Sequence, residues 1–358
     1  MVALSGGVDS ALAAALLQAE GYRVSGLFMK NWEDDDRDGY CQAAADYESA
    51  RVIAERLEIP LHAVNFAQEY RERVFQRFLA DCAAGLTPNP DVLCNREIKF
   101  DLFWAHAQHL GADLMATGHY ARIARRGDAL RLLAGCDEQK DQSYFLHTIA
   151  SEVLPYTRFP IGTLLKAEVR ARASALGFPN AARASSSGIC FIGERPFQAF
   201  LKRYLRDAPG PIVSDTGELK GHHDGLMYYT IGQRHGLGVG GPGAAWYVAD
   251  KRLGDKALVI VQGREHPRLY RSTCRTGVPY WLGPPPALPW HGHVKIRYRQ
   301  AREEAWVEGA ADGGLDVRFA RPQRAVTPGQ SAVFYEGSLC LGGALIRAEE
   351  PAPPAPAP

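Results

Sequence analysis

The chain opens with a short apolar run that breaks at a glycine pair and continues as a helical pattern. The run is 2–4, the break is Ser-Gly-Gly-Val-Asp-Ser at 5–10, and the helical pattern covers 11–20. A strand that turns directly into a helix points backbone N–H groups and the positive end of the helix dipole at one place. Because Gly6 and Gly7 let a ligand approach the backbone closely, this junction predicts an anion site, and we expect a phosphate group there.

Asp9 restricts which phosphate ligand the loop accepts. Its carboxylate repels a bare phosphate unless a metal ion lies between them, so we expect a Mg²⁺-nucleotide. The loop has neither the lysine of G-x-x-x-x-G-K-[ST] nor the G-x-G-x-x-G pattern, which argues against γ-phosphate transfer and dinucleotide binding. It resembles the PP-loop of the ATP pyrophosphatase superfamily, which holds the pyrophosphate end of ATP while a substrate oxygen attacks the α-phosphate. An ordinary glycine turn is the alternative, and the complete hexapeptide at this junction disfavours it.

Length and composition indicate a cytoplasmic protein of several domains. The 358 residues exceed one ordinary core, and 46% hydrophobic with 23% charged residues is typical of globular chains. No apolar run is long enough for a membrane helix and no signal-peptide pattern is present, so we expect no membrane partner. Seven cysteines without C-x-x-C spacing predict no metal site. With a net charge of +1, nucleic-acid binding would depend on local basic patches.

From residue 1 to about 150, strand-like and helical segments alternate, which predicts an α/β doubly wound parallel sheet. We expect this sheet to belong to a PP-loop catalytic domain over 1–206. Strands are expected at 2–4, 24–29, 61–65 and 114–117, and helices at 11–18, 43–57, 68–84 and 97–110. Ligands of such sheets bind at the carboxyl ends of the strands. The first strand is unusually short, so we expect the natural start of the chain to lie further upstream.

Two β-rich regions are expected to follow. Short strands and many glycines predict a small β-rich middle domain over 207–272. Alternating segments predict a C-terminal antiparallel β-barrel over 273–350, before a disordered Pro/Ala tail at 351–358. One expected strand, 294–299, has Lys295, Arg297 and Arg299 on one face. That face is either solvated or binds nucleic-acid phosphates.

Two cysteines lie in distinctive segments. Cys94 follows the rigid Thr-Pro-Asn-Pro-Asp segment 87–91 and is expected just ahead of a helix, where the helix dipole, Arg96 and Lys99 favour a thiolate. Cys190 follows a serine- and glycine-containing run, 185–188, at the edge of an expected mobile loop. Taken alone, each is either a reactive thiol or a small structural residue.

A series of motifs in this order resembles the MnmA family of tRNA-specific 2-thiouridylases. The motifs are SGGVDS (5–10), GLFMKNW (26–32), TPNPDVLCNREIKF (87–100), ATGHYAR (116–122), KDQSYFL (140–146), GICFIGER (188–195), GLMYYTIGQRHGLG (225–238), KIRYRQ (295–300) and TPGQSAVFYEG (327–337). Together they cover nearly the whole chain up to the tail. One departure is Ser185, where family members often have Asp, and it changes the electrostatics of the Cys190 loop.

The resemblance implies ATP-dependent replacement of O2 of the wobble uridine of tRNA by sulfur. The oxygen would be adenylated, and Cys190 would carry sulfur as a persulfide received from a sulfur-relay or cysteine desulfurase-linked protein. Cys94 would be the second catalytic thiol, which attacks the persulfide and is left in a Cys94–Cys190 disulfide. Asp91 would be a general acid or base. Mg²⁺ would come with ATP, and Asp9 is its candidate ligand.

The resemblance also implies two sets of binding residues. The ATP set is Ala3, Leu4, Ser5, Gly6, Gly7, Val8, Asp9, Ser10, Met29 and Gly118. The tRNA set is Asn89, Pro90, Asp91, His119, Lys140, Asp141, Gln142, Arg297, Tyr298 and Gln330. A PP-loop enzyme that adenylates a small molecule is the alternative, and it needs neither a second thiol nor a basic barrel. A non-catalytic RNA-binding module would leave the PP-loop without a role.

Overall fold

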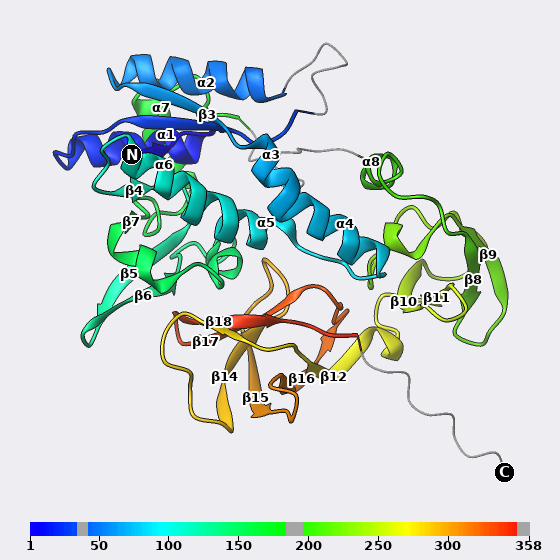
Figure 1. The fold of residues 1–358 in the computed structure, drawn as a ribbon. Coiled ribbons are helices and arrows are strands. Elements are labelled where there is room, and N and C mark those ends of the chain that lie inside the picture. Colours follow the sequence, from blue (N-terminus) through cyan, green and yellow to red (C-terminus); the bar gives the residue numbers. More distant parts are fainter. Residues whose placement is uncertain (34–41, 184–195, 349–358) are drawn as a thin grey trace.

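The computed structural model describes residues 1–33, 42–183 and 196–348 (Figure 1). Cys41, Ser185, Cys190 and the tail from 351 therefore lie outside the described residues. None of the described helices combines the length and apolarity required to cross a membrane.

The N-terminal part is built on a parallel sheet of five strands in the order β3-β2-β1-β4-β7. The strands are β1 Val2–Ala3, β2 Gly26–Lys30, β3 Leu61–Asn65, β4 Met115–Ala116 and β7 Thr157–Arg158. The apolar runs predicted the first four, whereas β7 has too little apolar character to be recognised. The central strands are buried on both faces, as their continuous apolar sequence requires.

Helices cover both faces of this sheet. They are α1 Val8–Ala19, α2 Gln42–Arg56, α3 Ala67–Tyr70, α4 Gln76–Ala83, α5 Pro90–Leu93, α6 Phe103–His109 and α7 Lys166–Ala175. One apolar cluster joins α1, α2 and α7 to one face, and a second joins the α3–α6 region to the other. Alanines fill the buried side of α1 and allow close packing. The predicted doubly wound class is confirmed.

Helix α5 corrects the expected position of Cys94. The helix was expected from 97, with Cys94 ahead of it, but α5 begins at Pro90 and continues through the π-helical stretch Cys94–Leu102 into α6. Pro90 is tolerated because the first helical position needs no N–H donor. Asn89 is the N-cap, and its Oδ1 accepts a hydrogen bond from the Asp91 N–H at 3.1 Å. Cys94 thus lies inside the helix, one turn from its start.

The middle region holds a four-stranded sheet in the order β10-β11-β8-β9. Its strands are β8 Gly210–Ser214, β9 Leu219–His223, β10 Trp246–Arg252 and β11 Ala257–Gln262. The short helix α8, Phe197–Leu201, precedes it. In Figure 1 this sheet lies at the opposite side of the molecule from α1.

The C-terminal sheet is larger than the sequence indicated. It contains β12 Tyr270–Arg275, β13 Tyr280–Trp281, β14 Trp290–Lys295, β15 Glu303–Gly309, β16 Leu315–Arg324, β17 Ser331–Glu336 and β18 Leu339–Leu345. It also contains a hairpin from the N-terminal part, β5 Ala121–Arg126 and β6 Ala129–Ala134, because β6 pairs with β18. The domain boundaries stay predictions, but this hairpin connects the first and last regions through one sheet.

The prediction of a basic strand over 294–299 is wrong after residue 295. β14 ends at Lys295, and the chain then turns, with a positive φ of 65° at Arg299. Lys295 is only 2% exposed and forms an ion pair with Asp141 at 3.2 Å. The alternation in the sequence suggested an exposed basic face, but a buried carboxylate from the N-terminal part draws Lys295 into the interior.

Candidate functional site

The PP-loop, residues 5–10, joins the carboxyl end of β1 to α1. Gly6 has a φ of 76°, and a Cβ at this position would lie 2.4 Å from the carbonyl oxygen of Asp46. The Gly6 carbonyl accepts hydrogen bonds from Ser49 Oγ at 2.8 Å and from Asn180 Nδ2 at 2.9 Å. The turn is therefore fixed by its neighbours before any ligand binds.

The amide N–H groups of the PP-loop are available to an anion. Within the described chain, none of the N–H groups from Gly6 to Ser10 donates a hydrogen bond. The Ser10 hydroxyl closes the turn instead, because it accepts from the Ser5 N–H at 3.2 Å and donates to the Gly7 carbonyl at 3.1 Å. The loop thus presents unpaired donors at a helix N-terminus, the arrangement that binds phosphate.

Asp9 lies beside two donors that the sequence analysis did not identify. Lys166 Nζ donates to both carboxylate oxygens of Asp9 at 2.7 Å, and the Tyr120 hydroxyl donates to Oδ1 at 2.7 Å. Burial, followed by the charge of Asp9, raises the pKa of Tyr120 well above its usual value, so the phenol stays protonated. Asp9 and Lys166 are 157 residues apart, and no local sequence signal joins them.

A further cation lies near this pair. Burial lowers the pKa of Lys140, and the positive charges of Arg299 and Lys166 lower it further, while Asp9 and Asp137 oppose the shift. Asp137 also accepts a hydrogen bond from the Lys166 backbone N–H at 2.9 Å. Cations therefore gather at the mouth of the PP-loop, where they can attract a polyphosphate.

The side chains of the remaining predicted ATP residues are packed inside the protein or, at Gly118, absent, so these residues shape the site through the backbone. Ala3, Leu4, Val8 and Met29 are buried in the apolar clusters, which leaves their side chains packed inside. A Cβ on Gly118 would lie 2.6 Å from the Ser10 nitrogen. Gly118 is therefore needed so that the end of β4 can approach the start of α1.

Asp9 fits a metal-bridging role better than a dedicated metal site. The described residues contain no group of three His, Cys, Asp or Glu side chains placed to hold a metal ion. The Asp9 side chain is 30% exposed, so its carboxylate is accessible to a ligand bound at the PP-loop. Mg²⁺ prefers one or two carboxylates together with substrate phosphates, and this donor set matches that preference.

The segment 87–91, which precedes and starts α5, is braced by the C-terminal sheet. Gln330 Nε2 donates to the Thr87 carbonyl at 2.6 Å, and the Thr87 N–H donates to the Pro328 carbonyl at 2.9 Å. Pro90 is buried, whereas Asp91 is partly exposed. The structure thus places Gln330 against the segment that contains Asn89, Pro90 and Asp91, three other predicted tRNA residues.

Cys94 is buried and packs among apolar side chains. The structure does not test its pairing with Cys190, because Cys190 lies outside the described residues. Both catalytic assignments stay predictions.

Several of the predicted tRNA residues have internal contacts. His119 is 7% exposed, its Nδ1 is 2.7 Å from Thr117 Oγ1, and burial lowers its pKa well below the usual value. Asp141 Oδ1 accepts from the Gly135 N–H, the Ser143 N–H and the Ser143 hydroxyl. Gln142 Oε1 accepts from the Tyr120 N–H at 2.9 Å. Their tRNA contacts stay predictions.

Arg297 and Tyr298 lie in the turn after β14. The Arg297 guanidinium donates to the Ile231 carbonyl at 2.8 Å and to Thr327 Oγ1 at 2.6 Å, and so joins the middle region to the C-terminal sheet. The Tyr298 ring packs against Phe145 with centroids 4.5 Å apart. Both side chains are half-buried.

Comparison with known proteins gives the family. A family model described as the tRNA methyl transferase HUP domain matches residues 1–194. Models described as the tRNA methyl transferase PRC-barrel domain and the aminomethyltransferase beta-barrel domain match residues 198–262 and 271–346. A tRNA-specific 2-thiouridylase MnmA of Methylococcus capsulatus is 53% identical over 97% of this chain and 95% of its own length. The chain belongs to the MnmA family.

Other members of the family give the same result. The MnmA proteins of Alkalilimnicola ehrlichii and Nitrosomonas eutropha are 51% and 52% identical, over 98% and 97% of this chain and 98% and 97% of their own lengths. The structure of NMN synthetase from Francisella tularensis is 19% identical to this chain, and the match covers 52% of this chain and 65% of the synthetase chain. The TM-score of 0.31 is too low to indicate a shared fold. The predicted family is thus confirmed over the full length.

Proposed function

We propose that this protein uses ATP to replace O2 of the wobble uridine of tRNA by sulfur. The proposal depends on the PP-loop, where the N–H groups from Gly6 to Ser10 have no acceptor among the described residues and lie beside the Asp9–Lys166 ion pair. This arrangement suits the pyrophosphate end of a nucleotide. The names of the full-length relatives support tRNA 2-thiolation as the reaction.

The first step makes the uridine oxygen a leaving group. O2 of uridine attacks the α-phosphorus of ATP, the bond to the pyrophosphate oxygen breaks, and an adenylated base and pyrophosphate form. Mg²⁺, when bound at Asp9 and the phosphates, neutralises the charge that develops on pyrophosphate. The N–H groups of the loop and Lys166 stabilise the same charge from the protein side.

The second step brings in sulfur. We propose that a persulfide on Cys190, charged by a donor protein, supplies the sulfur that attacks C2 and displaces AMP. The Cys94 thiolate attacks Cys190 Sγ, the sulfur–sulfur bond of the persulfide breaks, and the outer sulfur leaves as the sulfide that attacks C2. A Cys94–Cys190 disulfide remains, which an external thiol must reduce before the next turnover. Asp91, partly exposed in the first turn of α5, is the proposed acid or base.

The target base has to leave its stack to reach these groups. Segment 87–91 suits a receiving surface because prolines, the Asn89 cap and the Gln330 brace hold it rigid. Lys140, Tyr298 and Arg297 are proposed to contact tRNA nearby. With ATP and tRNA as substrates, we propose a cytoplasmic location.

Product analysis tests the function. With tRNA transcript, ATP, Mg²⁺ and a persulfide donor, we expect tRNA-stimulated release of AMP and pyrophosphate, and 2-thiouridine in the digested RNA. ADP as the main product would overturn the adenylation step. Turnover of a metabolite without tRNA would support the small-molecule alternative, and a methylated nucleoside would support the activity named in the family-model descriptions.

Substitution of the thiols tests sulfur transfer. Cys94→Ser and Cys190→Ser should each stop thiolation, but only Cys190→Ser should also remove the transferable persulfide. The control is Cys136→Ser, because Cys136 is exposed and free yet has no proposed role. Retained thiolation in Cys190→Ser would contradict the persulfide assignment. Peptide mapping of wild type after one turnover without reductant should show the 94–190 link.

A further inference from the structure

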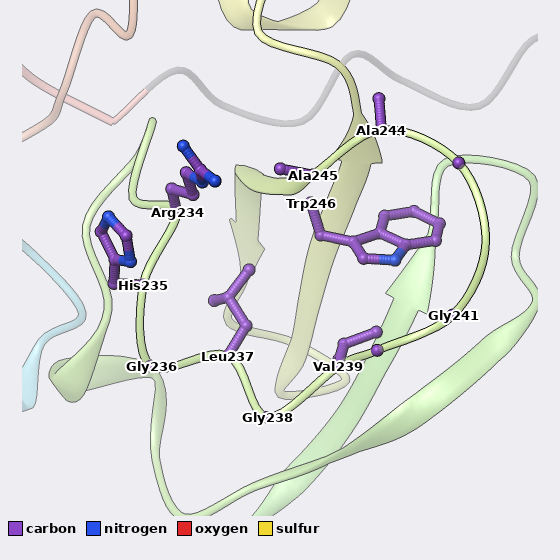
Figure 2. Close-up of a pocket in the computed structure, with 12 residues that line it drawn as sticks. Arg234, His235, Gly236, Leu237, Gly238, Val239, Gly241, Ala244, Ala245 and Trp246 are labelled. Carbon is purple, nitrogen blue, oxygen red and sulfur yellow. The ribbon is translucent and has the colours of Figure 1, made fainter.

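A glycine-rich loop of the middle region, residues 234–245, lines an open cavity that the proposed chemistry does not use. The cavity has a volume of about 460 Å³, and the loop precedes β10. Figure 2 shows the loop as a ring, with the side chains of Leu237, Val239 and Trp246 inside it and Arg234 and His235 at one side. In Figure 1 this region lies far from α1 and the PP-loop.

The backbone of the loop has N–H groups available to an anion. No backbone N–H from Arg234 to Ala245 donates a hydrogen bond to another described residue. Gly236 and Gly238 have φ values of 77° and 67°, while Leu237 between them has no positive φ. Positive-φ glycines at alternate positions can turn successive N–H groups toward one side, as in the concave sites where proteins bind anions.

Basic side chains lie around the cavity. Arg234 and His235 line it, and none of the described lining residues is acidic. Lys220, from β9, lies over the Trp246 ring with its Nζ 5.4 Å from the centroid and is paired with Glu218 at 2.7 Å. The buried Trp246 Nε1 has no hydrogen-bond partner among the described residues. The cavity thus combines an arginine, N–H donors without a partner among the described residues, and an aromatic ring.

The loop is held in this shape by neighbouring side chains. Gln233 Oε1 accepts from the Thr230 N–H at 2.9 Å, and Gln233 Nε2 donates to the His235 carbonyl at 2.9 Å. From β11, Gln262 Nε2 donates to the Pro242 carbonyl at 2.8 Å. The donors are therefore oriented by contacts outside the cavity, which lowers the entropic cost of binding a ligand.

We infer that the loop 234–245 binds a phosphate group of the RNA backbone, as a second contact with the tRNA remote from the reacting base. The N–H groups and Arg234 receive the phosphate oxygens, and the indole of Trp246 offers a surface for the adjoining sugar or base. The inference rests on the proposed function, because it takes tRNA as the substrate.

Matched aspartate substitutions test the site. Gly238→Asp and Gly217→Asp both add one negative charge at a glycine of positive φ, 67° and 87°, with nothing within 4 Å of the new Cβ. Gly217 belongs to the β8–β9 turn, so its variant controls for strain and charge in the same region. We expect Gly238→Asp to raise the Kd for a tRNA transcript and the KM for tRNA about tenfold at unchanged kcat. Gly217→Asp should bind as wild type does.

Arginine substitutions test the proposed contact between Arg234 and an RNA phosphate. Arg234→Ala should flatten the dependence of log Kd on log salt by about one unit. Arg252→Ala, which removes an exposed arginine paired with Asp255 in the same region, should leave the slope unchanged. If Gly238→Asp and Arg234→Ala both bind tRNA with the affinity and the salt dependence of wild type, the inference is wrong. The proposed function still stands in that case, provided that the wild-type protein thiolates tRNA. Absence of tRNA binding by wild type itself would overturn both.

Discussion

The Asp9–Lys166 ion pair sets the charge at the mouth of the PP-loop. The two side chains are 30% and 11% exposed and joined by two hydrogen bonds of 2.7 Å. Mg²⁺ and the phosphates of ATP compete for these groups, because the metal needs the carboxylate and the phosphates need the ammonium. We therefore expect Lys166 to move from Asp9 to the phosphates when the nucleotide binds.

Lys166→Ala should lower tRNA-dependent pyrophosphate release about a hundredfold and raise the KM for ATP, as expected for one lost donor to a developing charge. The Kd for tRNA should not change. The control is Arg172→Ala, an exposed arginine in the last turn of the same helix. Unchanged pyrophosphate release in Lys166→Ala would contradict the assignment, and thermal melting of both variants would show whether folding is intact.

At the scale of elements, the turn after β14, and not the strand itself, connects the middle region to the C-terminal sheet. Arg297 is drawn into the junction between the middle region and the C-terminal sheet, and burial lowers its pKa. The guanidinium keeps its charge there because the shift starts from a very high value. The turn therefore places a cation where two β regions meet.

Arg297→Ala should lower the free energy of unfolding by about 1–3 kcal/mol, since it removes hydrogen bonds made by a charged donor. Urea unfolding measures this. If Arg297 also contacts tRNA, the salt dependence of binding flattens by about one unit. An unchanged slope with an earlier unfolding midpoint would assign Arg297 to the junction alone.

At the scale of the whole molecule, the first and last regions share one sheet and one buried ion pair. β6 pairs with β18, and Asp141 of the N-terminal part pairs with Lys295 of β14 at 3.2 Å, with side chains only 4% and 3% exposed. Tyr144 adds a hydrogen bond to the Ser331 carbonyl at 3.0 Å. The PP-loop region and the C-terminal sheet are thus parts of one packed unit.

Lys295→Met should destabilise the protein by about 3–5 kcal/mol, because it leaves the Asp141 carboxylate buried without its partner. The double variant Asp141→Asn/Lys295→Met should recover part of this loss. Arg73→Met, which breaks the exposed pair Arg73–Asp101, should have little effect. Equal destabilisation in the single and double variants would contradict the coupling. Urea unfolding of all variants provides the comparison.

The sequence by itself determined the features that depend on neighbours in the chain. The PP-loop, the first four parallel strands and the α/β class followed from local apolar runs and from glycines at one strand-to-helix junction. The motifs also identified the family, because their order extends over nearly the whole chain. Such features need only residues a few positions apart.

Tertiary structure alone decided the contacts between distant segments. It placed Lys166 on Asp9, drew Lys295 away from an expected basic face to Asp141, and added the β5–β6 hairpin to the C-terminal sheet. An isolated lysine looks the same in sequence whether it is solvated or paired. Its role depends on whether folding brings a carboxylate within reach, since burying either charge alone costs more free energy than the pair does.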